Sequence, residues 1–192
     1  MSAVREPRLN FDQYLEVERS ADVRHEFHDG FLMPVATMTE AHNLIVLNVS
    51  AAIQRQLRNT DCIALTSGMR VWIPSQSRGL YPDASIVSGE REYHDTERDT
   101  LLNPVVLVEV LSRSTEDYDH GAKFRYYRSI PSFREYLLVS QHDRLLERYV
   151  KQSETNWSYE LFPATTAAIA LASVACTLTL DEIYEGVRLE SA

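Results

Sequence analysis

Two acidic residues of the chain occur where an acidic side chain is unusual. Glu109 lies within the apolar run Pro104–Leu111, and Asp83 follows Pro82 at the start of the run Asp83–Val87. A buried, isolated charge is costly, so such a carboxylate is usually neutralised, paired or bound to a metal. If the two runs pair as strands, both carboxylates meet at one place, and a hard cation such as Mg²⁺ removes their repulsion. The pattern therefore predicts a two-carboxylate metal site. The simpler alternatives are an arginine partner for Glu109 and turn capping by Asp83.

Lys123 is the third residue that could take part in chemistry. It lies on a helix expected at about Asp119–Ser129, whose apolar side includes Phe124 and Tyr127 and can pack on a sheet. Hydrolysis of a phosphodiester needs an activated water and stabilisation of the negative charge that develops on the phosphate. A metal ion and a lysine together supply both. Position alone favours a solvated lysine, so this role depends on the helix packing beside the two acids.

The expected elements alternate between helices and strands, and the buried-type runs predict a mixed α/β fold with a central β-sheet flanked by helices. We expect one domain over residues 1–192, made of an N-terminal helix and hairpin (10–36), a core (40–150), and C-terminal strands with a short helix (157–187). The Asp29-Gly30 pair is a strong hairpin-turn signal. Further expected elements are a helix at 10–17, a helix at 40–58, and strands at 62–66, 70–73, 83–87, 104–111, 135–140, 144–150 and 157–162.

Composition limits the classes of function. The formal net charge of −9 argues against non-specific coating of DNA, although the segment 113–151 is slightly basic, with eight Lys and Arg residues against six acids. No apolar run approaches the roughly 18 residues of a membrane span, and the N-terminus lacks the apolar core of a signal peptide. We therefore expect a cytoplasmic protein, in which Cys62 and Cys176 are reduced and buried thiols rather than a disulfide or a zinc site.

Four stretches resemble the Uma-type family of restriction-endonuclease-like proteins, a bacterial branch of the PD-(D/E)XK nuclease superfamily. They are residues 25–30 (HEFHDG), 81–87 (YPDASIV), 104–115 (PVVLVEVLSRST), and 119–127 followed by 132–139. Each motif is weak alone. Their order and spacing together are fairly specific, and the resemblance covers nearly the whole chain.

The resemblance implies a DNA endonuclease that depends on Mg²⁺ or Mn²⁺, with Asp83 and Glu109 as the metal-binding pair and Lys123 as the catalytic lysine. In the general superfamily pattern this lysine stands two residues after the glutamate, where this chain has Leu111. The resemblance further implies that Glu26 supports the site, by binding a second metal or its waters, with a half-exposed strand residue as an equal alternative. His42 matches a family histidine that could contact phosphate, position water or be structural.

Cutting both strands of DNA requires two sites, so we expect a homodimer. Two other functions stay open. The fold could be a non-catalytic binding or assembly module, which the negative charge and the apolar Leu111 favour modestly. Alternatively, the same metal site could act on a different phosphodiester, such as RNA.

Overall fold

The strand β8 (Val106–Leu111) lies at the centre of a six-stranded mixed sheet with the order β11-β10-β9-β8-β6-β3. β8 runs parallel to β9 and antiparallel to β6, and all six of its residues are buried. The remaining strands of this sheet are β3 (Cys62–Thr66), β6 (Ala84–Ser88), β9 (Glu135–Ser140), β10 (Leu145–Lys151) and β11 (Trp157–Pro163). The structure is a computed structural model and describes residues 8–189.

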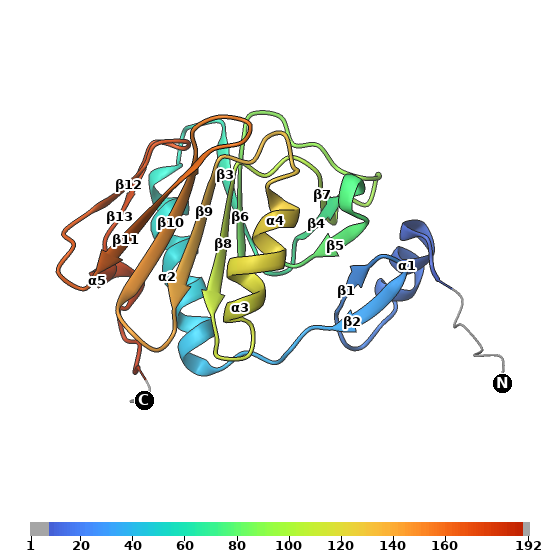
Figure 1. The fold of residues 1–192 in the computed structure, drawn as a ribbon, viewed down its shortest axis with the longest axis horizontal. Helices are drawn as coiled ribbons and strands as arrows, with labels where there is room; N and C mark the ends of the chain where they lie inside the picture. The colour runs from blue at the N-terminus through green and yellow to red at the C-terminus, as the bar shows by residue number, and fades with distance from the viewer. Residues whose placement is uncertain (1–7, 190–192) are drawn as a thin grey trace.

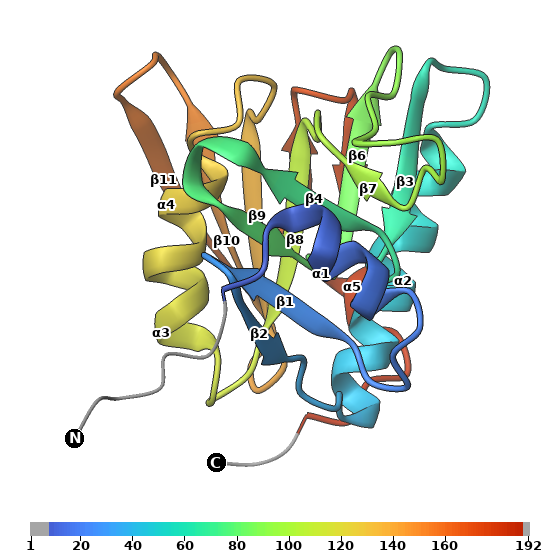
Figure 2. The ribbon, with the colours of Figure 1, turned by 90° about the vertical axis from the view of Figure 1, so that its right-hand side faces the viewer.

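The predicted mixed α/β architecture is confirmed: helices cover both faces of this sheet (Figures 1 and 2). The long helix α2 (Glu40–Gln56) packs on one face, where Val106, Val108 and Val110 of β8 join its apolar residues in one core cluster. The alternate residues Leu107 and Leu111 point to the opposite face and belong to a second cluster. Because side chains alternate along a strand, Glu109 shares this second face.

The second face is covered by a helical segment made of α3 (Glu116–Tyr118), η2 (Asp119–Lys123) and α4 (Phe124–Tyr127). It begins at Glu116, earlier than the expected Asp119, because acidic residues stabilise the first turn of a helix. Its middle part, η2, is a π-helix, which the sequence pattern did not predict. Such π-turns are rare and occur frequently at functional sites.

A second sheet has five strands in the order β2-β1-β5-β4-β7. Its strands are β1 (His25–His28), β2 (Phe31–Pro34), β4 (Arg70–Ile73), β5 (Arg78–Leu80) and β7 (Thr100–Leu101). The hairpin β1–β2 turns at Asp29 and Gly30, whose φ angles of 51° and 94° are both positive, as the Asp-Gly signal predicted. The short strands β5 and β7 were not predicted. The helix α1 (Phe11–Glu18) begins with a capping box at Asn10 and packs against this sheet.

The C-terminal part of the chain lies on the α2 side of the molecule (Figure 1). It comprises β12 (Ile169–Leu171), β13 (Cys176–Leu178) and the short helix α5 (Leu180–Ile183). α5 is tied to α2, since the Asn48 side-chain amide donates to the Ile183 carbonyl over 3.0 Å. Across residues 8–189, no helix is long and apolar enough to cross a membrane. The expected domain of 1–192 extends beyond the described residues at both ends.

The close approach of α1 to the second sheet gives a first prediction. A Cβ atom on Gly79 would lie 2.8 Å from the Phe11 ring, which itself stacks on Trp72 at 3.6 Å. Gly79→Ala should therefore lower the free energy of unfolding by about 1–3 kcal/mol, measured by urea denaturation. Gly68→Ala is the matched control, because its added Cβ meets only the end of the Arg24 side chain at 3.9 Å. Equal stability of the two variants would contradict the tight contact.

Candidate functional site

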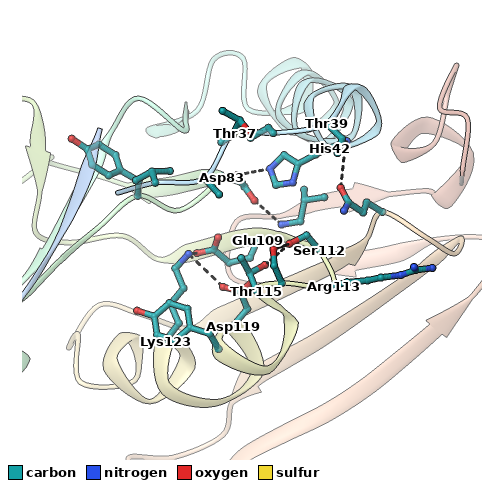
Figure 3. Close-up of a pocket in the computed structure, with 18 of the residues that line it drawn as sticks. Thr37, Thr39, His42, Asp83, Glu109, Ser112, Arg113, Thr115, Asp119 and Lys123 are labelled. Atoms are coloured by element: carbon teal, nitrogen blue, oxygen red, sulfur yellow. Dashed lines mark hydrogen bonds and ion pairs between the residues drawn. The ribbon is translucent and has the colours of Figure 1, made fainter. Parts of the chain in front are cut away.

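All five residues singled out from the sequence line one cavity of about 470 Å³ between the two sheets and the helices. They are Glu26, His42, Asp83, Glu109 and Lys123. Figure 3 labels four of them, His42, Asp83, Glu109 and Lys123. Five different elements or connections supply them, from the first strand to the helical segment after β8. The tertiary structure thus brings together side chains spread over nearly one hundred residues of sequence.

β6 and β8 are antiparallel neighbours, which is the condition on which the expected meeting of Asp83 and Glu109 depended. The register pairs Ala84 with Val108, so its extension by one residue places Asp83 opposite Glu109. Residues opposite one another on paired strands project to the same side. The Asp83 carboxylate is held against β8 by the Val110 N–H, which donates to its Oδ2 over 2.7 Å. Both acids are buried, with 5% and 3% of their surface exposed.

Glu109 is held from the helical segment above it. The Lys123 ammonium lies 2.8 Å from Glu109 Oε1, and the Tyr127 hydroxyl donates to the same oxygen over 2.8 Å. Lys123 and Tyr127 are four residues apart, so a helix presents both on one side. Lys123 is therefore a buried lysine of the cavity and not the solvated helix residue that its position alone favoured.

Asp119 is a member of the site that the sequence reasoning missed. It is buried and lines the cavity, and its Oδ1 lies 3.4 Å from Lys123 Nζ. The spacing of four residues between Asp119 and Lys123 on a predicted helix was the available signal. Three carboxylates consequently surround one ammonium, because Glu26 Oε1 also lies 3.9 Å from Lys123 Nζ.

The charged groups of the cavity shift one another's pKa values. Burial raises the pKa of Glu109 well above its ordinary value, and the neighbouring Asp119 and Asp83 carboxylates add to this against the opposing effect of Lys123. Burial alone would lower the pKa of Lys123, but the surrounding carboxylates, Glu109 foremost, raise it well above its ordinary value. The lysine thus stays charged, and the cavity holds more acid than its single ammonium balances.

Glu26 reaches the cavity from β1 of the second sheet. Its Oε1 accepts from the Tyr81 N–H over 3.2 Å, and its Oε2 lies 3.0 Å from His28 Nε2. Burial acts to raise the pKa of Glu26, but Lys123, His28 and the Tyr81 N–H outweigh it and lower the pKa. Glu26 is therefore an ionised, hydrogen-bonded group beside Lys123, and not the half-exposed strand residue of the alternative interpretation.

His42 contacts Asp83 directly. It lies in the first turn of α2, where its backbone N–H donates to the capping hydroxyl of Thr39 over 3.2 Å. Its Nε2 lies 2.9 Å from Asp83 Oδ1. Because the other Asp83 oxygen bonds to Val110, the histidine and the strand backbone together fix the orientation of this carboxylate.

The donor chemistry of the cavity fits a hard divalent cation. Mg²⁺ is commonly bound through one or two carboxylates and keeps several waters, and Asp83 and Glu109 provide such a pair. The buried Asp119 Oδ1, which finds no hydrogen-bond partner among residues 8–189, shows that the cavity has unused acceptor capacity. In the same part of the chain, no group of three or more His, Cys, Asp or Glu side chains is arranged to hold a metal ion. A cation in this cavity would therefore depend on the Asp83 and Glu109 carboxylates and on water for its ligands.

Comparison with known proteins places this geometry in context. The family model described as "Uma2: Putative restriction endonuclease" matches residues 11–181. Two relatives from Synechocystis sp. (strain ATCC 27184 / PCC 6803 / Kazusa) are similar in sequence. "Uncharacterized protein sll1609" is 32% identical over 78% of this chain and 84% of that protein, and "Uncharacterized protein slr1290" is 30% identical over 94% of each.

A solved structure shares the fold. A protein of Anabaena variabilis ATCC 29413, described as "a putative nuclease belonging to DUF820", superposes with a TM-score of 0.74. The similarity covers 94% of this chain and 99% of that chain at 14% sequence identity. This likeness supports the restriction-endonuclease-like core expected from the sequence.

Because the cavity holds more buried acid than base, substitutions of Lys123 and of Glu109 should change the free energy of unfolding by different amounts. Lys123→Met leaves several carboxylates unbalanced and should lower the free energy of unfolding by about 3–5 kcal/mol. Glu109→Gln keeps an acceptor for the Tyr127 hydroxyl. Because the pKa of Glu109 is raised in the folded protein, its ionised form lowers stability at pH values above the ordinary glutamate pKa. Removing this charge should therefore leave the free energy of unfolding at pH 7 unchanged or increase it. Urea denaturation in EDTA measures both. A loss in Glu109→Gln as large as in Lys123→Met would identify an ordinary structural ion pair instead.

Proposed function

Since the chain belongs to the Uma2 family, we propose that it is an endonuclease that hydrolyses the phosphodiester bonds of DNA with the help of Mg²⁺ or Mn²⁺. The observation that supports this most directly is the meeting of Asp83, Glu109 and Lys123 in one cavity. An ordinary structural site has little use for so many buried acids. A nuclease uses this combination, because carboxylates hold a cation and an ammonium stabilises phosphate charge.

Each of the five cavity residues singled out from the sequence has a proposed role. Asp83 and Glu109 hold the divalent cation, which when bound supplies Lewis-acid stabilisation of the phosphate. Lys123 donates hydrogen bonds to the phosphate oxygens, or orients the attacking water, and so opposes the build-up of negative charge in the transition state. His42 fixes the orientation of Asp83, and Glu26 supports the site by keeping the ammonium of Lys123 in place.

The substrate and the assembly extend this proposal. The exposed Arg113 lies at the cavity and is suited to contact a phosphate of the substrate, which offsets locally the net charge of −9. Two copies of the site are needed to cut both strands, so we propose a homodimer. The two reduced cysteines agree with a protein of the cytoplasm.

One observation favours a second candidate, a non-catalytic binding or assembly module. Both proposed metal ligands already have partners within the chain: Asp83 contacts His42, and Glu109 contacts Lys123 and Tyr127. A fold that had lost its metal chemistry would keep such contacts for stability. This candidate predicts no binding of divalent cations, whereas the nuclease requires it.

The decisive activity test uses plasmid DNA and purified protein with 5–10 mM Mn²⁺ or Mg²⁺, concentrations of roughly the order at which weak carboxylate sites fill. Asp83→Asn and Glu109→Gln should each reduce cleavage by at least about 100-fold, because each removes one ligand charge. Asp117→Asn is the matched control, since Asp117 is exposed on the same helical segment and does not line the cavity. Equal cleavage by the wild type and both site variants would exclude the proposed centre, and a parallel assay with RNA identifies the preferred substrate.

Calorimetry with Mn²⁺ separates the two candidate functions without a nucleic acid. We expect the wild-type protein to bind Mn²⁺ and Asp83→Asn to lose that binding, while circular dichroism shows an unchanged fold. The absence of binding to the wild type at about 1 mM Mn²⁺ would favour the non-catalytic module, because a functional carboxylate site should be substantially filled there.

A further inference from the structure

The ammonium of Lys123 lies where a divalent cation would compete with it for the same carboxylates. Its Nζ lies 2.8 Å from Glu109 and 3.4 Å from Asp119 (Figure 3). Glu26 lies 3.9 Å away, so three carboxylates meet around one positive charge. Oxygen ligands from several carboxylates are also what a hard divalent cation prefers. The ammonium of Lys123 therefore already occupies part of the space in which these carboxylates would bind a divalent cation.

Glu109 cannot serve the lysine and a divalent cation equally. Its Oε1 already forms an ion pair with Lys123 and accepts a hydrogen bond from the Tyr127 hydroxyl. A cation on the same carboxylate would stand close to the ammonium, and like charges at such a distance in a buried site repel strongly. Binding of the cation to this carboxylate would therefore favour a position of the ammonium farther from Glu109.

Asp119 is placed to receive it. Only 4% of its side-chain surface is exposed, and its Oδ1 faces Lys123 without a hydrogen-bond partner in the described chain. Asp119 and Lys123 begin and end the same π-helical segment, η2. The ammonium already lies 3.4 Å from Asp119 Oδ1, so only a short displacement of its flexible side chain would be needed to close this contact.

We infer that Asp119 is the alternative acceptor for Lys123: a divalent cation that binds Glu109 displaces the ammonium, which then pairs with Asp119 and stays beside the substrate. The inference rests on the proposed metal site and adds a positioning residue to it. Asp119 would hold Lys123 in the position from which it reaches the phosphate. It follows that the Lys123 ammonium and the divalent cation compete for Glu109. Asp119 then raises the affinity for the cation only by accepting the displaced ammonium.

The movement of Lys123 can be observed in the unmodified protein, because the chain contains only two lysines, Lys123 and Lys151. Lysine labelled with ¹³C at Cε gives two sets of resonances, which Lys151→Arg assigns. Lys151 is the internal control, since it pairs with the exposed Glu154 outside the cavity. Titration with Mg²⁺ should shift the Lys123 resonances and leave those of Lys151 in place. Saturable Mg²⁺ binding without a shift at Lys123 would overturn the inference.

A double-mutant cycle on Mn²⁺ affinity, measured by calorimetry, tests the role of Asp119. Lys123→Met removes the competing cation and should tighten binding by about tenfold or more, whereas Asp119→Asn should weaken it by about tenfold in the wild-type background. In the Lys123→Met background, Asp119→Asn should change affinity by less than about twofold, because its partner is gone. Asp117→Asn removes the same charge from the exposed side and should leave affinity within about twofold of the wild type.

The cycle and the titration distinguish this inference from its rivals. Equal weakening by Asp119→Asn in both backgrounds would mean that Asp119 contributes only its negative charge. Greater weakening in the Lys123→Met background would make it a direct metal ligand, and either result overturns the inference while leaving the proposed nuclease site intact. Failure of the wild type to bind Mn²⁺ at all would overturn the proposed function and this inference together. Should Lys123→Met not fold, Lys123→Gln replaces it and the Mg²⁺ titration of the wild type still decides.

Discussion

An excess of buried carboxylate over buried ammonium is the constraint on which the rest of the structure depends. Asp83, Glu109, Asp119 and Glu26 all line the cavity with Lys123, and most of their surface is removed from water. Burying several negative charges together opposes folding, so other interactions must offset this cost. The apolar contacts on both faces of β8 provide the stability that offsets it.

The second sheet also contributes to the cavity. It supplies Glu26, whose carboxylate binds the N–H of Tyr81, directly before the Pro82-Asp83 pair. The Tyr81 hydroxyl in turn accepts from Arg70 and donates to Glu18 of α1. Hydrogen bonds therefore connect the N-terminal helix to the segment before β6 that carries Asp83. Such supporting contacts hold a carboxylate in one orientation and so prepare it for a ligand.

The position of the lysine beside Glu109 is set by the helical segment and not by β8 itself. Two residues after Glu109, Leu111 points to the same face of the sheet and joins the apolar cluster there. The helical segment above that face places Lys123 at 2.8 Å from Glu109. Delivery from a helix also places Asp119 four residues earlier on the same side, an option that a strand lysine does not have.

The sequence alone determined the elements whose signals are local. The apolar run around Glu109 predicted a buried strand, the spacing of apolar residues predicted α2, and Asp29-Gly30 predicted the hairpin, because burial and backbone preference are written in neighbouring residues. Only the tertiary structure decided that β5 and β7 are strands, since such short segments are strands only through hydrogen bonds to distant partners. It also decided the contacts of His42 with Asp83 and of Asp119 with Lys123 at the cavity. A sequence can show that a charge will be buried, but its partner is set by the packing of elements far apart along the chain.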